Sequence, residues 1–164
     1  MEKSALQIAR AAYQPKLPAG LRGNVKIVEG APTQSVDNQE EIKALFPNTY
    51  GMPLVNFEPT DEKKEYAPIN IGIILSGGQA PGGHNVICGL YDGLKKQNPN
   101  SKLYGFLMGP GGLVDHNYLE MTDELIDEYR NTGGFDMIGS GRTKLEEEAQ
   151  FEKGMEVIRQ LGIN

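Results

Sequence analysis

A glycine-rich segment, SGGQAPGGHN at residues 76–85, has the residue types best suited to bind a phosphate group. Glycines let the backbone approach a ligand closely, and successive N–H groups at the start of a helix bind anions. The alternative is a tight strand-to-helix turn that binds nothing. Two Gly-Gly pairs around Pro81 exceed what such a turn requires, so we expect a nucleotide-binding-like loop. It is neither a Walker A loop nor the Gly-x-Gly-x-x-Gly signature of dinucleotide-binding folds.

A second segment that could bind phosphate is GSGR at residues 139–142. The Arg142 guanidinium could bind a phosphate with two parallel hydrogen bonds. Arg142 could equally be a surface residue or pair with one of the acids at 146–148, and both interpretations stay open. Lys144 has the same two interpretations, and the solvated one is favoured.

Five other reactive side chains have ordinary structural explanations. His84 could donate to a phosphate, but a hydrogen-bonded histidine at a helix start is favoured. Asp115 and His116 lack the third ligand that a metal site needs. Cys88 is on the apolar face of a predicted helix, where a buried, unreactive thiol is expected. Asp136 is within a predicted strand and has no obvious partner.

The second part of the chain alternates between strand and helix patterns. The first strand is apolar and β-branched, and glycine loops follow the main strands. The predicted strands are Ile69–Leu75, Lys102–Met108, Tyr118–Met121 and Phe135–Ile138. The predicted helices are Asn85–Gln97, a helix that begins after Thr122, and Leu145–Leu161. A second glycine loop is predicted at Gly109–Gly112. This alternation predicts an α/β fold: a partial parallel sheet with helices on both faces, and ligands at the carboxyl ends of its strands. The chain ends after a helix, where another strand is expected.

The first 68 residues contain seven of the ten prolines and form a predicted N-terminal extension of short helices and loops. Helices are predicted at Ser4–Tyr13 and at Asp37–Phe46, where Asp37 is the candidate N-cap. Asn48–Glu65 is predicted to be a loop that ends in a solvated charge run. We therefore predict two domains, the extension at 1–68 and a truncated donor-binding α/β domain at 69–164.

Composition excludes several classes of protein. The 164-residue chain has a net charge of −6 and no basic stripe, so nucleic acid is not an expected partner. No apolar stretch approaches the length of about 20 residues that a membrane span needs. The N-terminus lacks the apolar region of a secretory signal. The single cysteine cannot form an internal disulfide, which favours a cytoplasmic location.

Several segments together resemble the phosphofructokinases. Ile71–Gly89 resembles the opening of that family, and Gln79 with GGHN at 82–85 is similar to its pyrophosphate-dependent branch in the long form. Asn131–Lys144 matches the next signature of the branch. Segments 6–10, 13–17 and 46–51 resemble its N-terminal extension, so the resemblance covers nearly the whole chain.

The resemblance implies a glycolytic transferase that moves a phosphoryl group from pyrophosphate to the 1-hydroxyl of fructose 6-phosphate with Mg²⁺. It implies that Gly77 and Gly78 hold the donor through backbone N–H groups and that Arg142 bridges the donor phosphates. Such roles suit phosphoryl transfer, which depends on positioning and charge stabilisation. The complete set of expected donor-binding residues is Gly77, Gly78, Gln79, Gly82 and Arg142, with Lys144 and His84 as further candidates.

The family's metal-binding loop, catalytic aspartate and sugar-phosphate residues come later than residue 164. We therefore expect no catalytic residue and no metal ligand in this chain, which resembles the N-terminal part of a longer enzyme and is expected to be inactive alone. Its partners would be the remainder of its own chain and, at full length, other copies in a homo-oligomer. The alternatives are a non-catalytic regulatory subunit, against which the intact loop argues, and a free-standing phosphate-binding module. The residues present do not decide between pyrophosphate and ATP.

Overall fold

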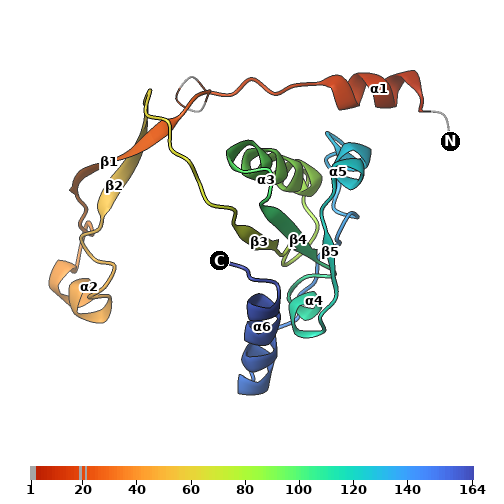
Figure 1. Cartoon of the computed structure of the whole chain (residues 1–164). Helices are drawn as coiled ribbons and strands as arrows, with labels where there is room; N and C mark the ends of the chain where they lie inside the picture. Colours follow the sequence, from red (N-terminus) through yellow and green to blue (C-terminus); the bar gives the residue numbers. More distant parts are fainter. Residues whose placement is uncertain (1–2, 19, 21) are drawn as a thin grey trace. The chain divides into compact units, whose positions relative to one another are not determined.

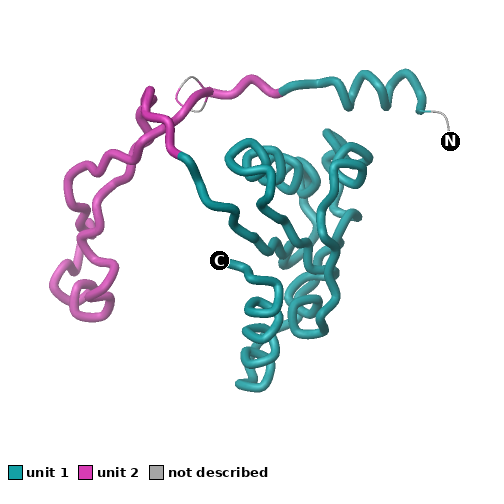
Figure 2. Tube along the Cα trace, in the orientation of Figure 1, with its two compact units in different colours: residues 1–14, 65–164 teal, residues 15–64 magenta. Residues whose placement is uncertain are grey.

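The structure, a computed structural model, describes residues 3–18, 20 and 22–164, which form two compact units (Figure 2). One unit contains residues 15–64, and the other contains the first 14 residues together with residues 65–164. Residues 1–14 and 65–68 of the predicted extension thus group with the α/β part of the chain. All of the predicted phosphate-binding residues are in the second unit. Among the described residues, no helix is long and apolar enough to cross a membrane.

A three-stranded sheet with the order β3-β4-β5 is the centre of the second unit. β3 (Asn70–Ile73) and β4 (Lys102–Phe106) are parallel and are joined through helix α3 (Gly83–Gln97), as predicted. β5 (Tyr118–Glu120) is antiparallel to β4, so the sheet is mixed. The short connection between β4 and β5 explains this, because a parallel neighbour needs a crossover of a dozen or more residues.

Helices cover both faces of this sheet, as expected. α3 and α5 (Asp123–Tyr129) are on one face, and α4 (Pro110–Val114) and α6 (Glu148–Gln160) are on the other (Figure 1). The core is on the α3 side, and Leu103 in β4 is fully buried there. The buried residues of this core are Ile87, Cys88, Tyr91, Leu94, Leu103, Met121, Ile126, Met137 and Ile138.

Local signals predicted several element ends correctly. The Thr122 hydroxyl accepts a hydrogen bond from the Leu125 N–H at 3.3 Å and caps α5, as expected. Ser4 and Gln7 form a capping box at the start of α1 (Ala5–Ala12). The last helix begins at Glu148 rather than at Leu145, and the predicted glycine loop at 109–112 is mostly the short helix α4.

The predicted strand Phe135–Ile138 is wrong. These residues form a turn in which the Gly139 N–H donates to the Phe135 carbonyl at 2.8 Å. Met137 and Ile138 are buried in the core, and a short run of buried apolar residues has the same pattern in a turn as in a strand. At the end of the chain, Ile163 forms a parallel bridge with Asn70 of β3.

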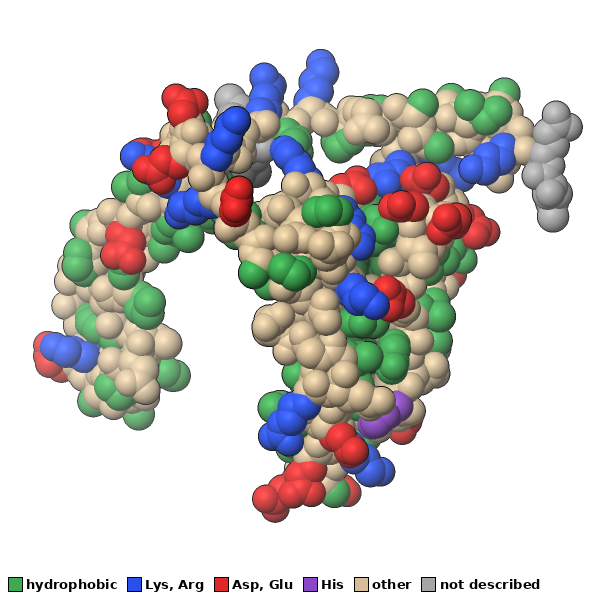
Figure 3. All heavy atoms as spheres, viewed as in Figure 1, with side chains coloured by type: hydrophobic (Ala, Val, Ile, Leu, Met, Phe, Trp, Pro, Cys, Tyr) green, Lys and Arg blue, Asp and Glu red, His purple; other side chains and the backbone are tan. Residues whose placement is uncertain are grey.

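The unit at 15–64 contains a two-stranded antiparallel ribbon, β1 (Val25–Pro32) with β2 (Pro53–Pro59), and helix α2 (Gln39–Leu45) between them. The prediction of a loop throughout Asn48–Glu65 is therefore wrong. Prolines at both ends of β2 argued against a strand, but proline is tolerated at a ribbon edge. Asn38 rather than Asp37 is the N-cap of α2. No described residue of this unit is buried, and hydrophobic side chains are visible on its surface (Figure 3).

Candidate functional site

The glycine loop follows β3 and leads directly into α3. Gly77 has a φ of 99° and Gly82 a φ of 101°, backbone conformations that favour glycine. Gly82 is the N-cap of α3 and provides no side chain to cap it. The 15-residue helix α3 thus begins inside the loop, and the positive end of its dipole faces the loop.

The loop is bonded to the segment that carries Arg142. The Gly77 N–H donates to the Gly141 carbonyl at 2.9 Å, and Ser76 forms a parallel bridge with Gly141. Gly109 approaches from the end of β4 so closely that a Cβ on it would be 2.6 Å from the Gly141 nitrogen. Glycine at 109 and at 141 is explained by this convergence of three backbone segments.

The N–H groups of two of the three predicted donor-binding glycines are used within the protein. Gly77 is bonded to Gly141, and the Gly82 N–H donates to the Gly133 carbonyl at 2.8 Å. The Gly78 N–H, in contrast, has no acceptor among the residues that the structure describes. Of the three predicted donor-binding glycines, Gly78 is therefore the one whose N–H is available to a ligand.

Arg142 and Lys144 are placed differently. The Arg142 Nη2 is 3.0 Å from the position that a Cβ on Gly78 would take, so the guanidinium lies against the loop. In the described part of the chain, no carboxylate is within ion-pair distance of Arg142. Lys144 pairs with Glu146 at 3.5 Å, and both side chains are more than two-thirds exposed. An ion pair with the acids at 146–148 was one of the two interpretations of Arg142, but Lys144 forms that ion pair instead.

His84 is buried, with 1% of the residue exposed. Its Nδ1 is bonded to the Thr132 hydroxyl, and its Nε2 accepts from the Met137 N–H at 3.0 Å. Burial lowers the pKa of His84, and the Asp136 carboxylate, 3.2 Å from Nε2, acts in the opposite direction. This placement agrees with the favoured interpretation of a hydrogen-bonded histidine at a helix start.

Gln79 is exposed and contributes to a pocket of about 470 Å³ beside the loop, which sequence reasoning missed. The wall of this pocket is mainly apolar and comes from the residues just after β4, from β5 and the residue before it, and from the 136–140 turn. The lining residues are Gln79, Leu107, Met108, Asn117, Leu119, Asp136, Met137, Ile138, Gly139 and Ser140. Because the pocket includes Gly139 and Ser140, it opens next to the segment that leads to Arg142.

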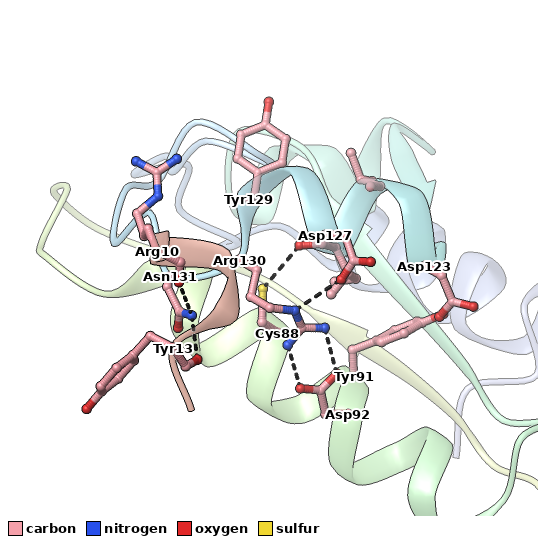
Figure 4. Close-up of polar contacts among 12 residues, drawn as sticks. Arg10, Tyr13, Cys88, Tyr91, Asp92, Asp123, Asp127, Tyr129, Arg130 and Asn131 are labelled. Carbon is pink, nitrogen blue, oxygen red and sulfur yellow. Dashed lines mark hydrogen bonds and ion pairs between the residues drawn. The ribbon is translucent and has the colours of Figure 1, made fainter. Parts of the chain in front are cut away.

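A clamp between α3 and α5 fixes the start of the Arg142 segment, and nothing in the sequence pattern indicated it (Figure 4). Arg130 binds both carboxylate oxygens of Asp92, at 2.7 and 3.0 Å, and Asp127 at 3.1 Å. The next residue, Asn131, donates from Nδ2 to the Arg10 and Tyr13 carbonyls at the end of α1. The start of the segment 131–142 is therefore held in place by the hydrogen bonds of Arg130 and Asn131.

The remaining candidates have no reactive arrangement. Cys88 is buried, its Sγ donates to the Ile126 carbonyl, and burial raises the pKa of the thiol. Asp115 and His116 are exposed. Within the described ranges, no three His, Cys, Asp or Glu side chains are grouped to hold a metal ion. The residues that the structure describes thus do not fit a Mg²⁺ site.

The fold is thus that of an α/β protein, with a βαβ unit, a glycine loop after its first strand and an arginine against that loop. A sequence model described as phosphofructokinase matches residues 70–164, and the chain belongs to this family. The chain is 64% identical, over 99% of its length, to the pyrophosphate–fructose 6-phosphate 1-phosphotransferase of Porphyromonas gingivalis. It is 49% identical, over its whole length, to the enzyme of the same name from Entamoeba histolytica.

The chain covers 30% of the length of each of these two relatives. A solved structure, the pyrophosphate-dependent phosphofructokinase of Nitrosospira multiformis, superposes with a TM-score of 0.51 at 22% identity. That superposition covers 60% of this chain and 25% of the other. At this identity, the likeness shows the fold alone.

Proposed function

We propose that this chain forms the donor-binding region of a pyrophosphate-dependent phosphofructokinase, which transfers a phosphoryl group from pyrophosphate to the 1-hydroxyl of fructose 6-phosphate. Family membership and the names of relatives at 64% and 49% identity support the proposal. The same names favour the enzyme over a free-standing phosphate-binding module. A cytoplasmic location, use of Mg²⁺ and assembly of the full-length enzyme into homo-oligomers are parts of the proposal.

The observation that carries the proposal is the pairing of Gly78 with Arg142. Gly78 offers a backbone N–H that has no acceptor among the described residues. Arg142 offers a guanidinium that is 3.0 Å from the position of a Cβ on Gly78 and has no carboxylate partner among the described residues. An anion that lies between them would satisfy both donors. A charged oxygen forms stronger hydrogen bonds than a neutral one, so a phosphate oxygen suits this position.

Each predicted donor residue has a distinct task in this proposal. Gly78 and Arg142 contact the phosphate, and Gln79 is beside them at the rim of the adjacent pocket. Gly77 and Gly82 shape the loop through their positive φ angles and their bonds to the facing segment. The α3 N-terminus adds a favourable dipole. The chain thus holds the donor in place and offsets the charge on the moving group.

The test is pyrophosphate binding, measured by titration calorimetry on the full polypeptide that contains this chain. We expect Arg142→Ala to weaken binding about 10- to 100-fold, because it removes charge-assisted hydrogen bonds to the phosphate. Arg159→Ala is the matched control, since Arg159 is an exposed arginine of α6. Equal affinities of the Arg142→Ala variant and the wild type would refute the proposed site.

A further inference from the structure

We propose that His84 is a positioning residue of the donor site: as a neutral imidazole with its proton on Nδ1, it holds the glycine loop and the Arg142 segment together. The inference rests on the proposed function, because it explains how the two halves of that site keep their geometry. His84 touches no ligand in this role and acts through the segment that it binds.

His84 and its neighbours join the two segments at several points. The His84 N–H donates to the Gly134 carbonyl at 2.9 Å, and the Gly82 N–H donates to the Gly133 carbonyl at 2.8 Å. The His84 side chain adds the third bond, from the Met137 N–H to Nε2 at 3.0 Å. The start of α3 is therefore bonded to residues 133–137, which lead into the 139–142 segment.

The hydrogen bonds allow one protonation state of the ring. The Thr132 hydroxyl donates to the Tyr129 carbonyl at 2.6 Å, so its oxygen must accept a proton from the His84 Nδ1. The Met137 N–H needs a lone pair on Nε2. A neutral ring that is protonated on Nδ1 meets both demands, whereas the other tautomer and the charged ring do not.

The packing around the ring leaves little space for an alternative arrangement. A Cβ on Gly134 would be 2.8 Å from the His84 Cε1, and a Cβ on Gly83 would be 2.6 Å from the Phe135 ring. The Tyr129 ring meets the imidazole edge-on, with 4.7 Å between centroids. Glycines at 83 and 134 thus let the two segments close around the histidine.

A proton on Nε2 would change this arrangement. The titratable groups that face the ring are Asp136, with Oδ1 3.2 Å from Nε2, and Tyr129. A protonated Nε2 cannot accept from the Met137 N–H but can donate to Asp136. Acid therefore exchanges the bond to the Met137 N–H for a contact with a largely exposed carboxylate, and residues 133–137 lose one of their three bonds to the start of α3.

The test compares His84→Leu, which removes both ring nitrogens, with His84→Gln, whose amide oxygen reaches toward the Met137 N–H. His116→Gln is the matched control, because His116 is the other of the two histidines and is exposed. Amide hydrogen exchange at Met137, measured by NMR on the full polypeptide, reports the positioning bond without any ligand. Pyrophosphate titration of the same samples measures the affinity of the donor site.

We expect His84→Leu to raise the Met137 exchange rate at least about 10-fold and to weaken pyrophosphate binding by a similar factor. His84→Gln should recover most of the Met137 protection and most of the pyrophosphate affinity. His116→Gln should change neither quantity. Burial lowers the pKa of His84 from its ordinary value of about 6.5. In the wild type, the Met137 exchange rate, corrected for its intrinsic pH dependence, should therefore increase as the pH falls through this lowered pKa, and the increase should be absent in His84→Gln.

Unchanged protection of Met137 in His84→Leu, or a pH response that persists in His84→Gln, would overturn the inference. If His84→Leu does not fold, the His84→Gln variant and the pH response of the wild type still test whether His84 positions the segment. If the wild type itself does not bind pyrophosphate, the proposed function fails, while the exchange data still test the positioning role.

Discussion

At the scale of the residue, burial decides what His84 and Arg142 can do. His84 is enclosed and has a partner at each ring nitrogen, whereas Arg142 is exposed and has no carboxylate partner among the described residues. Both were candidates to bind phosphate from their type and position alone. The enclosed residue is suited to hold the structure, and the exposed cation is suited to meet a ligand.

The buried histidine predicts a pH dependence of stability. Burial lowers the pKa of His84 in the folded state below its ordinary value of about 6.5. The unfolded state then binds more protons near that pH, so the free energy of unfolding is highest above about pH 7 and decreases as the pH falls through 6.5. Urea denaturation between about pH 7.5 and 5.5 should show a shallower decrease in His84→Gln than in the wild type. Parallel curves for the two proteins would contradict this prediction.

At the scale of the element, glycines have opposite roles in α3 and β4. Gly93 is within α3, and a Cβ there would meet no atom within 4 Å. Gly105 is in β4, and a Cβ there would collide with the ends of the Met121 and Ile138 side chains. Glycine weakens the helix at the first position and allows close packing at the second.

This contrast predicts two substitutions of opposite sign. Gly93→Ala should raise the free energy of unfolding by up to about 1 kcal/mol, because alanine favours the helix. Gly105→Ala should lower it by about 1–3 kcal/mol, because the core has no room for the added methyl group. Chemical denaturation of the two variants beside the wild type provides the comparison. A stabilising Gly105→Ala would show that the core can rearrange at that position.

At the scale of the whole molecule, all of the buried core residues that the structure describes belong to the unit that contains residues 65–164. The unit at 15–64 has a two-stranded ribbon and exposed apolar side chains, including Ile27, Leu54 and Phe57. A two-stranded ribbon alone is at best marginally stable in water. The two units therefore differ in how much burial supports their backbone hydrogen bonds.

The difference should be visible in hydrogen exchange followed by mass spectrometry. We expect amides of β1 and β2 to exchange at least about 10-fold faster than those of β4 and α3, because few buried contacts oppose local opening. Peptides from both units in one sample serve as each other's control. Comparable protection would mean that another surface covers the ribbon in solution.

The sequence by itself determined the glycine loop, the cap at Thr122, the βαβ unit and the resemblance to phosphofructokinases. These features depend on residues close together in the chain, where turn, cap and periodicity signals act. The same local patterns misassigned Phe135–Ile138 and missed the ribbon, because buried turns and exposed strands lack distinctive periods. Only the tertiary structure decided that Arg142 faces Gly78 and that His84 binds Met137, which is 53 residues away in the chain. The roles of these side chains depend on neighbours that folding brings together, so no local pattern contains them.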